Sequence, residues 1–131
     1  MLQIIPVIER NIHKILADNF NLFTSYALCS NERPNEIRVE SARRRATKVI
    51  SQANFASQIG AIDAAEYCVL SELAEEVRDS VIALRKVYIS RDSRPFGAVH
   101  DANSDVTRAV VALDRYCAHL ITRYGHDTAA A

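Results

Sequence analysis

Helix-breaking residues are scarce in this chain, and their positions constrain its fold more than any other feature of the sequence. Three glycines and three prolines occur among 131 residues. Pro95 and Gly97 stand two residues apart, and the other four fall where helices could begin or end. Those four are Pro6, Pro34, Gly60 and Gly125. The long segments between them predict a fold made of helices.

Apolar residues repeat at the three- and four-residue spacing of an amphipathic helix. The spacing is most regular near the C-terminus, in Val106, Val110, Leu113, Cys117, Leu120 and Tyr124. We therefore predict an all-α fold, a helical bundle of four to five helices in which residues 1–131 form a single domain. One long loop is expected at about 92–103, between the last two helices.

The first half of the chain predicts two helical regions separated by a loop at 30–36 that contains Pro34. Residues 4–28 form either one helix or two, with an inward stripe of Ile5, Ile8, Ile12 and Ile15. The helix over about 36–57 carries an inward stripe made mostly of alanine, which would let a neighbouring helix approach closely. Its members are Val39, Ala42, Ala46, Val49, Ala53 and Ala56.

The second half predicts a long helix that starts after Gly60, with Asp63 as its N-cap. The inward stripe of this helix is expected to be Ala65, Val69, Leu73, Val77, Val81, Leu84 and Tyr88. A last helix over about 104–124 follows and is expected to stop at Gly125, because glycine commonly follows a helix C-terminus.

Composition excludes several classes of protein. Sixteen basic and sixteen acidic residues cancel, so any attraction to nucleic acid or to an acidic membrane must be local. The longest stretches without charge, 19–31 and 49–62, fall short of the roughly 20 apolar residues that cross a bilayer. Three widely spaced cysteines favour reduced thiols, so we expect a cytoplasmic protein, or a virion component if the source is viral.

Charged residues gather on two of the predicted helices. The helix over 36–57 has a basic face formed by Arg38, Arg43, Arg44, Arg45 and Lys48. The next helix has an acidic face formed by Glu66, Glu72, Glu75, Glu76 and Asp79. The arginine triplet could contact a phosphate backbone, but the acidic helix downstream and Glu40 favour ion pairing within or between subunits. Nucleic-acid binding is therefore possible but not favoured.

The loop at 92–103 is the best candidate for a functional surface, because long loops between helices are often functional. It contains Arg94, Pro95, Phe96, Gly97 and His100. The five residues between Arg94 and His100 give a spacing that resembles the arginine-to-histidine motif of HEPN-type helical ribonucleases. That resemblance implies an RNA-cleaving enzyme in which His100 acts as acid or base and Arg94 stabilises the phosphate. In the alternative interpretation, Pro95 and Gly97 shape a turn and Phe96 anchors it in the core.

No pattern for metal or cofactor binding is present. The chain lacks a histidine pair at i and i+4, a Cys-x-x-Cys and a Glu-x-x-His. We predict no cofactor and a protein that is not an enzyme. The favoured function is a helical assembly protein that forms homo-oligomeric or ring-like contacts, for example a virion or phage connector, adaptor or coat subunit. Two alternatives stay open, the ribonuclease using Arg94 and His100 and a small nucleic-acid-binding regulator using Arg43 to Arg45.

Overall fold

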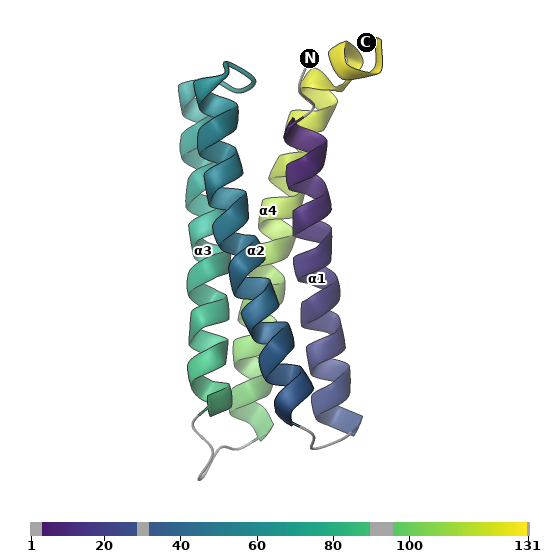
Figure 1. Ribbon diagram of the computed structural model, residues 1–131, viewed down its shortest axis with the longest axis vertical. Coiled ribbons are helices and arrows are strands. Elements are labelled where there is room, and N and C mark those ends of the chain that lie inside the picture. Colours follow the sequence, from purple (N-terminus) through teal and green to yellow (C-terminus); the bar gives the residue numbers. More distant parts are fainter. Residues whose placement is uncertain (1–3, 29–31, 90–95, 131) are drawn as a thin grey trace.

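The computed structural model consists of four long helices (Figure 1), which are α1 (Ile4–Leu28), α2 (Glu32–Gln58), α3 (Ala64–Ile89) and α4 (Phe96–Ala130). It describes the backbone of residues 4–28, 32–89 and 96–130 and the side chains of residues 4–19, 38–87 and 101–124. Among the described residues, helix contacts join α1 to α2, α2 to α3, α3 to α4 and α4 back to α1. The helices therefore form a ring in which α2 and α4 occupy diagonal corners. This arrangement confirms the predicted all-α bundle.

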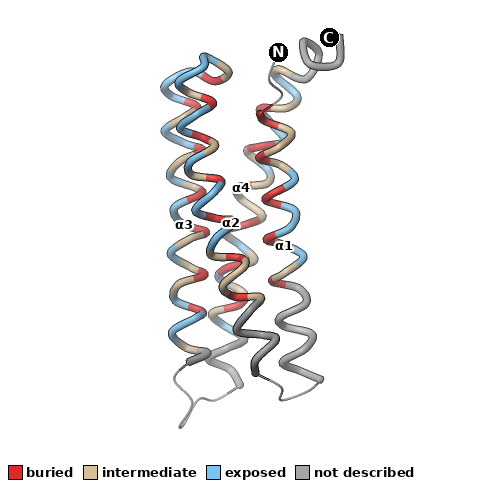
Figure 2. Tube along the Cα trace, in the orientation of Figure 1, coloured by how far each residue is buried: buried red, intermediate tan, exposed pale blue. Residues whose placement is uncertain are grey.

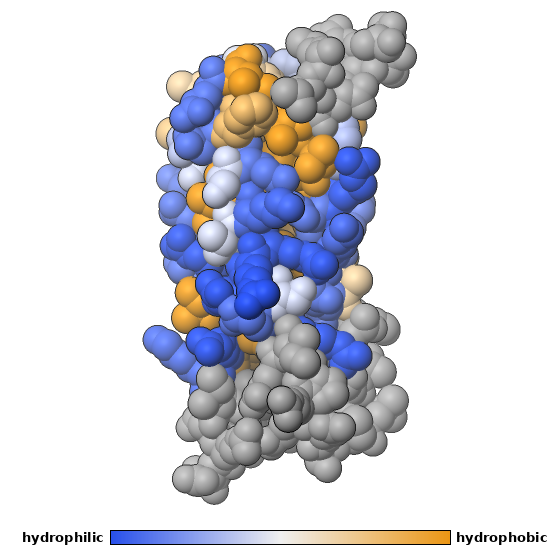
Figure 3. Space-filling view, viewed as in Figure 1, coloured by the Kyte–Doolittle hydropathy of each residue, from blue (hydrophilic) through white to orange (hydrophobic). Residues whose placement is uncertain are grey.

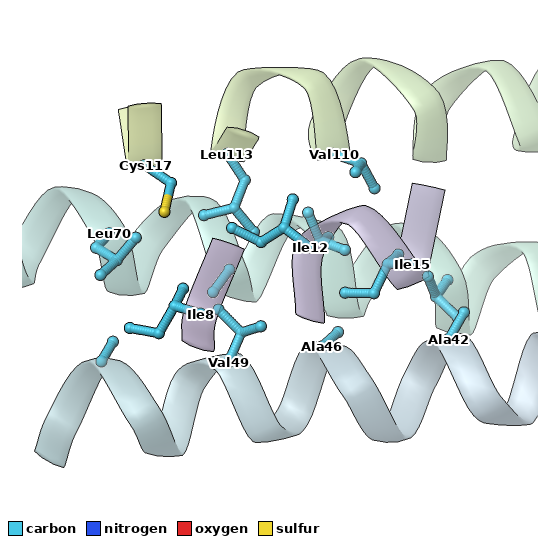
Figure 4. Packing of buried hydrophobic residues seen from close by; sticks show 14 of the residues in the cluster. Ile8, Ile12, Ile15, Ala42, Ala46, Val49, Leu70, Val110, Leu113 and Cys117 are labelled. Atoms are coloured by element: carbon cyan, nitrogen blue, oxygen red, sulfur yellow. The ribbon is translucent and has the colours of Figure 1, made fainter. Parts of the chain in front are cut away.

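Buried residues run along the inner side of each helix (Figure 2), so the core fills the space that the four helices enclose. The stripes predicted for the first, second and last helices are all confirmed, except that Tyr124 is only partly buried. In Figure 4, Ile8, Ile12 and Ile15 lie between α2, with Ala42, Ala46 and Val49, and α4, with Val110, Leu113 and Cys117. Large side chains on α1 thus face small ones on α2.

Two polar contacts define how α1 and α2 align. Asn11 Nδ2 donates to Gln52 Oε1 at 2.9 Å, and Arg45 donates to the Asp18 carboxylate at 2.9 Å. Figure 4 shows Ile15 of α1 beside Ala46 of the facing helix. Both residues have no exposed surface, so the contact between them is closely packed.

The turn between α2 and α3 is built from glycine and a capping box. Gly60 has a φ of +76°, which a residue without Cβ adopts freely. Its N–H donates to the carbonyl of Ser57 while the N–H of Ala61 donates to Ala56, the Schellman pattern that ends a helix. At the start of α3, the Asp63 side chain accepts from the Glu66 N–H at 2.8 Å, which confirms Asp63 as the N-cap.

Three predicted helix boundaries are wrong, and in each case the helix is longer than expected. α2 begins at Glu32 and includes Pro34, which is tolerated in a first turn because N–H groups there have no intrahelical partner. α4 begins at Phe96, so residues 96–103 of the predicted loop at 92–103 are helical. α4 also continues through Gly125 to Ala130. A glycine costs a helix only about 1 kcal/mol, and the helix ends in Ala129 and Ala130, which are strong helix formers. Residues 4–28, for which one or two helices were open, form one.

The predicted inward stripe of the third helix is wrong at its first half. Ala65 and Val69 are exposed, whereas Leu70 and Ala74 are buried. A run of residues spaced by four drifts around a helix of 3.6 residues per turn, so Ala65, Val69 and Leu73 rotate away from the core. The side chain of Tyr88 lies outside the described residues.

Most large apolar side chains in the described part of the chain are buried within one copy. Among the described residues, the large apolar side chains that remain exposed are Phe55, Ile59 and Val69. Phe55 and Val69 lie on the parts of α2 and α3 nearest their connecting turn, and Ile59 lies in that turn. The inward stripes of the four helices thus cover one another in the described part of the chain.

Candidate interaction surface

The basic face of α2 is organised around one carboxylate. Glu40 accepts hydrogen bonds from Arg43, two of them at 3.1 Å, and lies 3.6 Å from Arg44 and 3.9 Å from Arg85 of α3. The hydrogen bonds with Arg43 hold the pKa of Glu40 below its ordinary value and raise that of Arg43. Three cations around one anion leave this region positively charged.

The arginine triplet does not form a continuous free strip. Arg43 is bound to Glu40, and Arg45 donates to Asp18 at 2.9 Å and to Ser41 at 3.1 Å. Arg44, whose side chain is 75% exposed, is the member that extends into solvent. Phosphate binding by the triplet would require the loss of contacts that join α2 to α1, so the structure favours pairing of these arginines with carboxylates.

A stripe of exposed residues runs along the outside of α2 at helical spacing. We call it the α2 stripe; its members are Arg44, Lys48, Ser51 and Phe55 of α2 and Ile59 in the turn that follows. It is basic at one end and apolar near the α2–α3 turn. Figure 3, which views the bundle over α2, shows hydrophilic residues across the middle and apolar residues toward the end that carries this turn. In the described part of the chain, Lys48 makes no ion pair.

A second exposed stripe runs along α3 with the opposite charge. We call it the α3 stripe; its members are Ala65, Val69, Glu72, Glu76 and Asp79. It too is apolar near the α2–α3 turn and charged farther away. In the predicted acidic face, Glu72, Glu75, Glu76 and Asp79 are exposed, and Asp79 pairs with Arg78 at 3.3 Å. Glu66 is the exception, because its side chain is only 6% exposed.

The charged part of the α3 stripe borders a groove of about 440 Å³ between α3 and α4. Its walls carry the carboxylates of Glu76, Asp79 and Asp105 and the guanidinium of Arg108, which pairs with Asp105. Ser80, Ala109 and Ala112 complete the lining with small side chains. The groove is therefore acidic at its edges, with three carboxylates to one cation. Sequence reasoning missed Asp105 and Arg108, although their i, i+3 spacing marked an exposed ion pair on the last helix.

Glu66 serves a structural purpose instead of forming part of a surface. Its carboxylate accepts from the Asp63 N–H at 2.9 Å, from Arg123 at 2.7 Å and from the Tyr124 hydroxyl at 2.7 Å. This ties the beginning of α3 to the last part of α4. The hydrogen bond to Glu66 raises the pKa of Tyr124, and burial raises that of Tyr116 nearby.

Further polar groups lie inside the bundle. Asn19 donates to the Thr107 hydroxyl at 2.6 Å, and that hydroxyl donates to the Asn103 carbonyl at 3.0 Å. The Oδ1 atoms of Asn19 and Asn103 are buried and have no hydrogen-bond partner. Cys117 is buried too, and burial raises the pKa of its thiol to about 12. A thiol with such a pKa stays protonated at neutral pH, which makes it a poor nucleophile.

The residues behind the ribonuclease alternative are not brought together as a described site. Arg94 and Pro95 lie outside the described residues, and Phe96, Gly97 and His100 are described only as backbone of α4. The predicted irregular backbone is thus wrong for Gly97 and His100, which lie in a helix. The acid-base and phosphate-binding roles of His100 and Arg94 stay predictions.

Within the described residues, no three histidine, cysteine or acidic side chains gather as metal ligands would. No helix in this part of the chain is long and apolar enough to span a bilayer. Comparison of the chain with protein-family models, with curated proteins and with solved structures found no match. The function is therefore argued from the surface described above.

Proposed function

We propose that this protein is a non-enzymatic helical assembly module that works by self-association, forming homo-oligomeric or ring-like contacts. The observation that carries the proposal is the separation of charge onto different helices of a molecule whose net charge is zero. Basic side chains project from α2, and acidic ones project from α3 and its groove with α4. Complementary charges on separate surfaces favour the encounter of copies in a defined orientation.

The exposed apolar residues support the same proposal. Phe55 is 38% exposed, Val69 40% and Ile59 45%, whereas large apolar side chains are usually buried. Exposed large apolar residues next to complementary charges are a common composition for a contact surface. A connector, adaptor or coat subunit is the type of protein that such a module suits, in the cytoplasm or in a virion.

The regulator alternative has less support. A phosphate-binding face needs cations that are free of carboxylates, whereas Arg43 and Arg45 are both hydrogen-bonded to one. Pairing of arginine with protein carboxylates is already the use that this chain makes of its basic face.

Multi-angle light scattering over a wide range of protein concentration tests the proposal. We expect a mass above 14.6 kDa that rises with concentration. We also expect it to fall as salt is added, because the Debye length shrinks from about 10 Å at 0.1 M to about 3 Å at 1 M salt. A monomer at every concentration in low salt contradicts the proposal. A duplex RNA and a duplex DNA added to the same samples test the regulator alternative.

A further inference from the structure

We propose that one copy of this chain inserts its α2 stripe into the groove between α3 and α4 of a second copy, so that copies join head to tail. This inference rests on the proposed function and specifies the surfaces through which self-association occurs. Three observations lead to it: the order of residue types along the two stripes, the height at which those residues lie, and the position of the stripes on different sides of the bundle.

The two stripes present residue types in the same order from the α2–α3 turn outward. The α2 stripe begins with Ile59 and Phe55 and continues to Lys48 and Arg44. The α3 stripe begins with Ala65 and Val69 and continues to acidic residues ending at Asp79. When both bundles point the same way, apolar residues therefore meet apolar residues and cations meet carboxylates.

Spacing along the helices matches as well. Lys48 lies seven residues from Phe55, and Glu76 lies seven residues from Val69, so both intervals are about 10.5 Å at 1.5 Å per residue. Arg44 lies a further four residues along, about 6 Å, and Asp79 a further three, about 4.5 Å. Both cations can thus reach carboxylates while Phe55 contacts Val69.

The two stripes lie at nearly the same position along the bundle axis, so a second copy need not slide along that axis to bring them together. Arg85 of α3 lies 3.9 Å from Glu40 of α2, which shows which residues of these antiparallel helices are level with one another. Counting from this pair toward the turn brings Lys48 within one residue of the level of Glu76, and Phe55 within one residue of the level of Val69, an offset of about 1.5 Å. A second copy placed beside the first at the same height therefore meets it in register.

The shape of the two surfaces fits this arrangement. The α2 stripe is a convex row on the outside of one helix, whereas its target is a groove of about 440 Å³ between two helices. Ser80, Ala109 and Ala112 in the lining are small, which leaves room for the long side chains of Arg44 and Lys48. The carboxylates of Glu76, Asp79 and Asp105 exceed the single cation Arg108 there, so an incoming cation improves the charge balance.

The two surfaces cannot meet within one copy. α4, which forms one wall of the groove, occupies the corner diagonal to α2. Each copy that docks its α2 stripe thus leaves its own groove open for another copy. Such a contact generates a closed ring if the rotation between neighbours closes, and an open filament if it does not.

Charge reversal tests the pairing of the two surfaces. The first variant is Arg44→Glu with Lys48→Glu, and the second is Glu76→Lys with Asp79→Lys. Each alone is expected to raise the concentration for half-assembly about tenfold or more, because like charges then face one another. The chain that carries all four substitutions is expected to recover assembly, since its charges are again complementary. Light scattering reads the mass, and circular dichroism verifies that each variant is helical.

A matched control separates this contact from a general effect of net charge. Arg10 and Lys14 are both exposed on α1 and lie outside both stripes and the groove. Their joint replacement by glutamate changes the net charge as much as the first variant does, and we expect assembly to be retained. Equal loss in this control overturns the inference, as does a four-substitution chain that fails to assemble.

The outcomes also separate the inference from the function on which it rests. A wild-type monomer overturns the proposed function and the inference together. A wild-type oligomer that both charge-reversal variants leave unchanged overturns the inference alone, because self-association then uses other surfaces. Loss in each variant with recovery in the combined chain supports both.

Discussion

Replacement of Ala46 by leucine tests whether the alanine stripe of α2 is as closely packed as the structure indicates. Ala46 has no exposed surface, and it lies beside Ile15 of α1 (Figure 4), which has none either. A leucine adds three carbon atoms at this position. If the site held a void of that size, burial of those carbons would stabilise the fold by about 2.4 kcal/mol, at about 0.8 kcal/mol per CH₂ group.

Close packing predicts instead that Ala46→Leu destabilises the fold. Adding carbons to a filled core forces side chains from their rotamers and shifts the backbone, at a cost of about 1–3 kcal/mol. We expect a loss of about 3 kcal/mol, because the neighbouring α1 residue Ile15 is a branched side chain that is fully buried. For a chain of this size, such a loss lowers Tm by about 10 °C.

Thermal unfolding followed by circular dichroism, with urea unfolding for the free energy, measures this change. Ala118→Leu on the exposed surface of α4 is the control and should change stability by less than about 0.5 kcal/mol. Ile15→Ala in the Ala46→Leu background removes the carbons that leucine displaces. The double variant should then lose at least about 1 kcal/mol less than the sum of the two single losses. A higher Tm for Ala46→Leu would refute close packing at this stripe.

Three other predictions concern polar and thiol groups. Glu66→Gln should lower the free energy of unfolding, measured in urea, by about 1–2 kcal/mol, because the buried acceptor loses its charge while the half-exposed Arg123 returns to water. The exposed Glu75→Gln is the control, and an equal loss in both variants would contradict this prediction. Absorbance titration of tyrosinate should show a component above the ordinary pKa, because the Glu66 hydrogen bond raises the pKa of Tyr124. The contribution of this hydrogen bond to stability is complete below about pH 10 and is lost as pH rises through the pKa of Tyr124 in the folded protein. Glu66→Gln should move the Tyr124 component of the titration to lower pH. Thiol labelling followed by peptide mass spectrometry should modify the exposed Cys68 in the folded protein but not the buried Cys117, and equal rates would show that the core opens.

Much of the fold could be predicted from local patterns. The stripe that runs from Val106 to Leu120 alternates steps of four and three residues, which stays on one face of a helix, and it is buried as expected. The stripe that begins Ala65, Val69 and Leu73 takes four successive steps of four up to Val81, so its first half drifts off the core. The spacing of apolar residues thus predicts which of them are buried only when the mean step between them is close to the 3.6 residues of a helical turn.

The candidate surface was less accessible to sequence reasoning, because it combines residues from separate helices. The exposed charges of Glu72, Glu76 and Asp79 were predictable, since no apolar spacing includes them. The groove was not, because α4 forms one of its walls and only tertiary packing brings Ser80 close to Ala109. The burial of Glu66 had a readable signal, however. Asp63 and Glu66 stand three residues apart at a helix start, the spacing of a capping box.

The short connection between α2 and α3 has a consequence for the order of folding. Residues 59–63 join these two helices, whereas the Asn19–Thr107 contact of α1 with α4 closes 88 residues of chain. Loop closure costs about 0.6 kcal/mol for each doubling of length, so the second closure is harder by roughly 2–3 kcal/mol. We expect neighbouring helices in the sequence to pair first, and the contact between α1 and α4 to form last and open first.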